Sequence, residues 1–86
     1  MNDRARELLI KAALDGVPQT RGTYSSGGAY CAIGLLEKAA GCFYPRQQFI
    51  DLYDIQEWEA DEIMYANDHL GWDFLTIARK VGVENA

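Results

Sequence analysis

The chain has 86 residues, 49% of them hydrophobic, and a formal net charge of −5. This length suits one small domain with a single modest core, and the apolar content argues against intrinsic disorder. No apolar run approaches the ~20 residues of a membrane-spanning helix, and the charged residues that follow Met1 do not resemble a signal peptide, so we expect a cytoplasmic protein without membrane contact.

The negative charge is concentrated in one part of the chain. Residues 1–46 carry six basic and four acidic side chains, whereas residues 47–78 carry eight acidic and no basic ones. Nucleic-acid binding depends on clustered Lys and Arg that neutralise phosphates. The composition therefore excludes nucleic acid as a direct partner and favours a basic protein.

The first half of the chain predicts two helices joined by a loop. Apolar residues at helical spacing predict a helix over residues 3–15, which Gly16 and Pro18 end. Residues 16–28 are polar and rich in Gly and Ser, which predicts a loop, and a second helix is predicted from residue 29 or 30 to residue 40, with Gly41 as its C-terminal cap. Gly34 inside that helix predicts a close approach by another segment, for which we expect the first or the fifth helix.

The acidic half predicts further helices. Pro45 is suited to the first turn of a third helix that runs to residue 53. Residues 57–67 predict a fourth helix with Trp58 and Ile63 directed inward and Glu59 and Glu62 directed outward.

A fifth helix is predicted after Asp73, a favourable N-cap, and Gly82 ends it. No segment alternates with period two for long enough to predict a strand. The predicted fold class is therefore all-α: a single compact domain, residues 1–86, of four to five short helices with a Gly/Ser-rich loop between the first two.

Cys31 stands at the predicted start of the second helix, where two interpretations are open. A helix N-terminus lowers a thiol pKa and favours the reactive thiolate, so Cys31 could serve a minimal cysteine enzyme with His69, the only histidine, as base and Asp68 or Asp73 orienting it. Cysteine is also among the most frequently buried residues, and here its neighbours are apolar. We favour the second interpretation, in which Cys31 fills the core.

Metal and disulfide chemistry are not expected. One histidine and two cysteines at unrelated spacings match no zinc pattern, and the acidic residues lack the spacing of a calcium loop, so we expect no metal or other cofactor. Cys31 and Cys42 would lie about 16 Å apart along a helix, too far for a disulfide, which predicts two reduced thiols.

The acidic segment is also rich in large aromatic residues. Tyr and Trp dominate binding hot spots, and acidic charge speeds encounter with a basic surface. The candidate partner-binding residues are Asp54, Glu57, Trp58, Glu59, Asp61, Glu62, Tyr65 and Trp72.

Two stretches, "YCAIGLLEKAAG" and "ANDHLGWDFLTIARKVG", resemble a loose group of small uncharacterised proteins of bacteriophages, prophages and their hosts. In that group a Tyr- or His-Cys-Ala-x-Gly-x-Leu helix is followed by Asn-Asp, a turn and Phe-x-x-Ile-Ala. The matching positions here are Tyr30, Cys31, Ala32, Gly34, Leu36, Asn67, Asp68, Phe74, Ile77 and Ala78. The resemblance implies a compact helical fold in a mobile-element setting and implies no activity.

The preferred hypothesis is a small non-catalytic interaction protein, such as a phage-type accessory factor or inhibitor, that presents its acidic and aromatic surface to a basic protein. One alternative is the cysteine enzyme described above. Another is a small-ligand-binding protein that uses the loop of residues 22–30. Self-association is compatible with the aromatic content.

Overall fold

Five short α-helices and one two-stranded hairpin make up residues 1–82, the part of the chain that the computed structural model describes. In chain order the elements are α1 (Asp3–Leu14), β1 (Ser25–Ser26), β2 (Ala29–Tyr30), α2 (Ala32–Ala40), α3 (Gln47–Tyr53), α4 (Glu57–Tyr65), the π-helical turn η1 (Ala66–Leu70) and α5 (Phe74–Lys80). The domain is compact and mostly helical, as predicted, but it is not strictly all-α, because β1 and β2 form a short hairpin in the segment that was expected to be only a loop and the start of the second helix.

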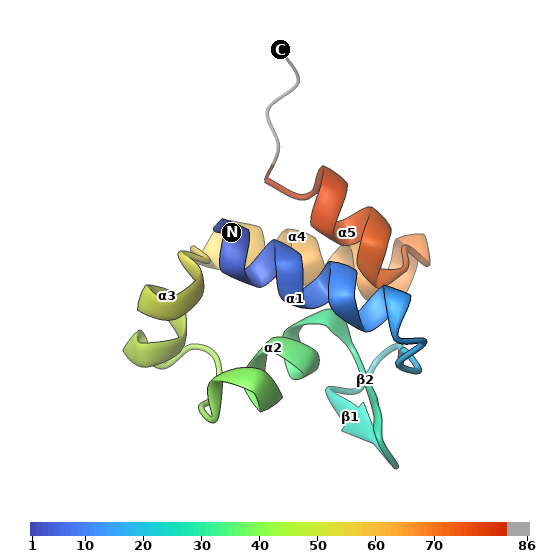
Figure 1. Ribbon diagram of the computed structural model, residues 1–86. Coiled ribbons are helices and arrows are strands. Elements are labelled where there is room, and N and C mark those ends of the chain that lie inside the picture. Colours follow the sequence, from blue (N-terminus) through green and yellow to red (C-terminus); the bar gives the residue numbers. More distant parts are fainter. Residues whose placement is uncertain (83–86) are drawn as a thin grey trace.

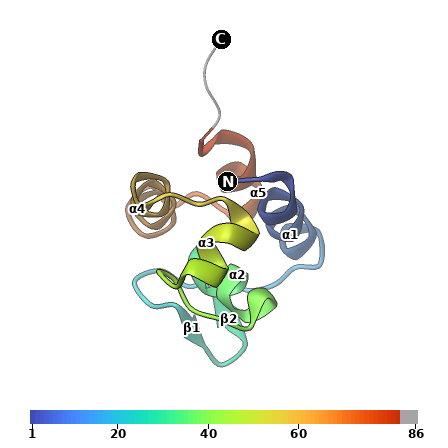
Figure 2. The ribbon, with the colours of Figure 1, turned by 90° about the vertical axis from the view of Figure 1, so that its left-hand side faces the viewer.

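The helices surround one apolar core. Figure 1 shows α1 and α5 side by side, with α4 behind them and α2 and the hairpin below. Figure 2, turned by 90°, separates α4 from α1, and α2 contacts both of them. The fully buried side chains include Leu9, Ile33, Leu36, Phe49, Tyr53, Ile55, Ile63, Phe74, Ile77 and Val81. Burying each such aliphatic or aromatic side chain stabilises the fold by about 1.5–3 kcal/mol.

The predicted ends of the first and fifth helices are confirmed. Asn2 caps α1 by accepting a hydrogen bond from the Ala5 N–H, and Asp15 is the C-terminal cap. Asp73 caps α5 by accepting from the Thr76 N–H at 2.8 Å. In both cases a polar side chain satisfies an amide that the first helical turn leaves without a partner.

The second helix begins later than its apolar pattern predicts. Ala29 and Tyr30 form strand β2, which pairs with β1 in an antiparallel register. The Tyr30 N–H donates to the Pro18 carbonyl and the Tyr30 carbonyl accepts from the Thr20 N–H, both at 3.0 Å. These long-range bonds hold residue 30 in an extended conformation, so α2 starts only after Cys31.

The third helix also starts later than expected. Arg46 is its N-cap, so Pro45 precedes the helix instead of occupying its first turn. The fourth helix does not end at residue 67: α4 ends at Tyr65, the helical backbone continues through η1 to Leu70, and Gly71, with a φ of 71°, is the cap.

The predicted orientation of α4 is confirmed for Ile63, which is buried, and for Glu62, which is exposed, but it was wrong for Trp58 and Glu59. Trp58 is 60% exposed, whereas Glu59 is only 3% exposed. The helix is turned so that Ala60 and Ile63 face the core, which carries Glu59 inward beside them. Its carboxylate pairs with the amino group of Met1, which compensates its charge.

No helix within residues 1–82 is long and apolar enough to cross a membrane.

Candidate functional site

The side chain of Asn67 joins three segments that are distant in sequence. Its Oδ1 atom accepts hydrogen bonds from the Ala32 N–H at 3.0 Å and from Gln19 Nε2 at 2.7 Å. Its Nδ2 atom donates to the Thr20 carbonyl and to Asp68 Oδ1, both at 2.8 Å. The residue is 1% exposed, and the four bonds use the full capacity of the amide. Asn67 therefore fixes residues 15–31 between α1 and α2, which we call the connector, against the start of α2.

Arg21 and Gly22 reinforce this attachment. The Arg21 guanidinium donates to the Asn67 carbonyl at 2.9 Å and to the Gly71 carbonyl at 3.1 Å. The Gly22 N–H donates to Asp68 Oδ1 at 2.8 Å. These bonds hold residues 19–22 against η1, although their composition alone predicts only a loop.

Cys31 acts as the N-cap of α2. Its Sγ atom accepts a hydrogen bond from the Gly34 N–H at 3.3 Å, and its own N–H donates to the Tyr24 carbonyl at 3.1 Å. The residue is 5% exposed. Burial raises the pKa of the Cys31 thiol, and hydrogen bonds from the Gly34 and Ile33 amides offset this only in part. The neutral thiol is favoured, which fits a structural cap better than a nucleophile.

Gly34 permits the close approach that its position predicts, but the predicted neighbour was wrong. The contact is made by the Tyr24 backbone, just before β1, and not by the first or fifth helix. The Tyr24 carbonyl carbon lies 2.8 Å from the position that a Cβ atom on Gly34 would take. The connector can pack on α2 only where α2 has no side chain.

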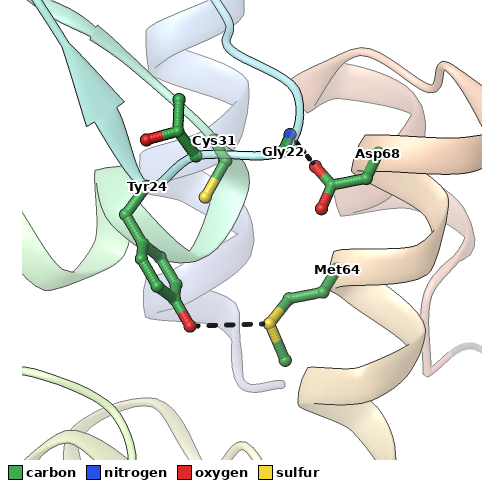
Figure 3. Close-up of a pocket in the computed structure, with 6 residues that line it drawn as sticks. Gly22, Tyr24, Cys31, Met64 and Asp68 are labelled. Atoms are coloured by element: carbon green, nitrogen blue, oxygen red, sulfur yellow. Dashed lines mark hydrogen bonds between the residues drawn. The ribbon is translucent and has the colours of Figure 1, made fainter.

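A pocket of about 280 Å³ lies where the connector, α2 and α4 meet (Figure 3). Its lining residues are Gly22, Thr23, Tyr24, Cys31, Met64 and Asp68. The Tyr24 hydroxyl lies 3.9 Å from Met64 Sδ, and the Cys31 sulfur points toward the space between these two side chains (Figure 3). Gly22 and Tyr24 belong to the loop that the sequence proposes for ligand binding. Met64, one helical turn before Asp68, also lines the pocket, but nothing in the sequence around it points to a binding role.

His69 does not line this pocket. It is exposed on η1, and its ring lies 5.2 Å from the ring of Tyr65. Within residues 1–82 no hydrogen bond links His69 to Cys31 or Asp68. The structure thus places Cys31 and Asp68 at one pocket and the histidine outside it.

The outer face of α4 carries the second candidate site. Trp58, Asp61, Glu62 and Tyr65 follow one another at helical spacing, and Trp58 and Tyr65 are 60% and 57% exposed. We call these four residues the α4 face. Because i, i+3, i+4 and i+7 share one side of a helix, the two aromatic rings flank the two carboxylates.

The other proposed binding residues are more scattered. Asp54 and Glu57 are exposed near the start of α4, and Glu59 is buried. Trp72 is half-buried, and Lys80 Nζ lies 5.4 Å from its ring centre. Neither Glu59 nor Trp72 therefore belongs to the α4 face.

The exposed carboxylates of this region are not neutralised by neighbours within residues 1–82. The ion pairs there are Met1 with Glu59 and Lys11 with Asp15. A groove of about 470 Å³ at the start of α4 continues the surface, with Asp54, Trp58 and Glu62 among its lining residues. This part of the molecule presents negative charge and aromatic area together.

The structure also bears on the cysteines and on groups of side chains that could bind a metal ion. Cys31 and Cys42 are both free thiols. Within residues 1–82 no group of three or more His, Cys, Asp or Glu side chains is arranged to hold a metal ion.

Comparison of the chain with protein-family models, with curated proteins and with solved structures finds no match.

Proposed function

We propose that the protein is a small non-catalytic interaction domain whose α4 face binds a basic protein. We propose that it acts as a phage-type accessory factor or inhibitor, in the mobile-element setting that the resemblance of its motifs implies. The observation that carries the proposal is the exposure of Trp58 and Tyr65 beside two carboxylates that have no ion-pair partner within residues 1–82.

The charges and the aromatic rings of the α4 face would contribute to binding in different ways: the charges to the association rate, the rings to the lifetime of the complex. Unpaired acidic side chains attract a basic surface and raise the association rate, an effect that salt weakens. Aromatic side chains supply large contact areas at a small cost in conformational entropy and hold the complex once it forms. An acidic surface without aromatic residues would supply only the first of these.

The surroundings of Cys31 do not favour thiol catalysis. The Cys31 sulfur is buried and already accepts a backbone hydrogen bond, and the only histidine lies outside its pocket. These observations favour the structural role of Cys31.

The test compares three immobilised forms of the protein in a lysate of the native host. The first is the wild type, the second carries Glu57→Lys, Asp61→Lys and Glu62→Lys, and the control carries Glu7→Lys, Asp15→Lys and Asp51→Lys. Both variants change the net charge equally, and all six positions are exposed. We expect a basic protein to be retained by the wild type and the control but not by the α4 variant.

The purified partner then permits a quantitative measurement. Trp58→Ala or Tyr65→Ala should weaken its binding by about 2 kcal/mol, the size of a typical hot-spot effect. Equal retention by all three baits, or unchanged affinity of both alanine variants, would rule out the α4 face as the binding surface.

A further inference from the structure

We propose that the pocket between Tyr24, Cys31, Met64 and Asp68 binds an alkylammonium group, that is, a positively charged nitrogen on a short apolar chain. This site is separate from the α4 face, and its occupation does not depend on a basic protein partner.

The lining of the pocket combines one charge with soft, weakly polar groups. Asp68 is its only ionisable carboxylate, and the remaining side-chain contacts come mainly from the Tyr24 ring, the Cys31 thiol and the Met64 thioether. Sulfur atoms and aromatic rings suit an apolar chain, and an aromatic face also attracts a cation. A carboxylate at one end of such a lining selects a ligand with a positive end and an apolar body.

The Asp68 carboxylate is held in place before any ligand arrives. Its Oδ1 atom accepts from the Gly22 N–H and from Asn67 Nδ2, both at 2.8 Å. Its second oxygen faces the opening between Cys31 and Met64 (Figure 3) and has no hydrogen-bond or ion-pair partner within residues 1–82. A fixed acceptor of this kind needs little reorganisation to bind a cation.

Anions are unsuited to the same pocket. The N-terminus of α2 would ordinarily attract them, but the Ala32 N–H already donates to Asn67 Oδ1 and the Gly34 N–H to Cys31 Sγ. The nearby guanidinium of Arg21 is bound to two backbone carbonyls instead of facing the pocket. The charge that remains available is therefore the negative charge of Asp68.

The size of the pocket limits the ligand. About 280 Å³ is at or below the lower end of the range of ~300–1,000 Å³ typical of small-molecule sites. A short aliphatic amine fits this volume better than a nucleotide or a folded peptide. Two sources supply such an alkylammonium group: a free alkylamine, and the side chain of a lysine from another protein.

The test is a titration of the ¹⁵N-labelled protein at constant ionic strength, followed by the amide resonances of Gly22, Cys31 and Asp68. The probes are n-butylammonium, its neutral analogue n-butanol and its anionic analogue butyrate. We expect saturable shifts of all three resonances with n-butylammonium, and clearly weaker binding of the other two probes. A ligand of this size should bind in the millimolar range.

Asp68→Asn and Asp51→Asn form a matched pair of variants. Asparagine at position 68 keeps an oxygen that can accept from the Gly22 N–H but removes the charge, so n-butylammonium should bind about tenfold more weakly. Asp51 is exposed, does not line the pocket and lies outside the α4 face, so its substitution should leave binding unchanged. The dispersion of the same spectra shows whether each variant is folded.

A second variant keeps the test decisive if Asp68→Asn does not fold. Met64→Phe places a larger side chain at the half-buried wall of the pocket and should abolish the shifts while the carboxylate stays in place. Nα-acetyl-lysine methylamide distinguishes the two sources, because tighter binding than n-butylammonium identifies a protein side chain and weaker binding a free amine. Absence of saturable shifts, equal binding of n-butanol, or unchanged binding by Asp68→Asn or Met64→Phe would overturn the proposal.

Discussion

The carbonyl oxygen of Tyr24 occupies the space that a Cβ atom on Gly34 would require. The same carbonyl accepts the N–H of Cys31, the N-cap of α2. The contact between Tyr24 and Gly34 therefore fixes both the start of α2 and the path of the connector, and Tyr24 also lines the pocket.

Gly34→Ala should destabilise the protein even though it improves helix propensity. Alanine gains about 1 kcal/mol over glycine inside a helix, but its Cβ atom would displace the Tyr24 backbone. We expect a lower midpoint in urea denaturation and faster hydrogen exchange of the Cys31 amide. Ala39→Gly, on the exposed side of α2, is the control: it should cost about 1 kcal/mol without altering that exchange. A stabilised Gly34→Ala would show that the connector does not pack against α2.

Asn67→Ala should lower the free energy of unfolding by about 3 kcal/mol or more. The substitution leaves the buried Ala32 N–H and other groups without partners, and each unsatisfied buried group costs about 1–3 kcal/mol. Asn67→Asp should also destabilise the fold, because it replaces the Nδ2 donor with a second carboxylate beside Asp68. Urea denaturation measures both changes, and a loss below 1 kcal/mol for both variants would contradict the central role of Asn67.

Cys42 should react with iodoacetamide before Cys31 at neutral pH. Cys42 is half-buried, whereas Cys31 is buried and its thiol pKa is raised by burial. A raised pKa reduces the thiolate fraction, and the thiolate is the reacting form. Mass spectrometry of the labelled peptides should show Cys31 modified much more slowly than Cys42 in the native protein. Rapid labelling of Cys31 in the native protein would support the cysteine-enzyme alternative instead.

Asp73 should stabilise the protein at neutral pH and lose this effect in acid. Hydrogen bonds from Thr76 lower the pKa of the Asp73 carboxyl below its ordinary value of 3.8. A lowered folded-state pKa contributes stability above the unfolded-state pKa, and that stability is lost as the pH falls through the folded-state value. Asp73→Ala should cost about 1 kcal/mol near pH 7, as removal of an N-cap usually does, and less below pH 3.8. Thermal denaturation at several pH values tests this, and a cost that does not depend on pH would contradict it.

Glu37 should behave in the opposite way. Burial raises the pKa of its carboxyl above the ordinary 4.5, although the Tyr44 N–H that it accepts partly offsets the shift. A raised acid pKa means that the folded state binds the proton more tightly, so the charged form lowers stability above the raised pKa. Glu37→Gln keeps an acceptor for Tyr44 and should stabilise the protein at pH 7. This advantage should shrink as the pH falls through the raised pKa toward 4.5; an advantage that grows in acid would be inconsistent with the burial of Glu37.

Much of the helical content could be predicted from local signals. Asn2 and Asp73 cap helices through hydrogen bonds within one turn, and Gly41 ends α2 with a φ of 72° that glycine adopts without strain. The free thiols of Cys31 and Cys42 also follow from the separation of these two residues along a helix. These features depend on residues a few positions apart, so the sequence contains the whole interaction.

The predictions for the start of α2 and for the orientation of Trp58 and Glu59 on α4 were wrong because contacts between distant segments override the local helical pattern there. Tyr30 directly precedes an apolar helical run, but its backbone forms hydrogen bonds with Pro18 and Thr20. Glu59 lies inward because α4 is turned to bury Ala60 and Ile63. A periodic pattern on α4 allows more than one orientation, since Trp58 is as apolar as the residues that became buried.

Local signals in the sequence specify the mostly helical fold, the caps at Gly41 and Asp73 and the acidic, aromatic character of the second half of the chain. Tertiary packing sets which side of α4 faces solvent, the attachment of the connector to Asn67, and the pocket that Met64 and Asp68 share with Cys31. Caps and turns are set by interactions within a few residues, whereas a pocket requires the burial and hydrogen bonding of segments some forty residues apart, whose free energies no local pattern records.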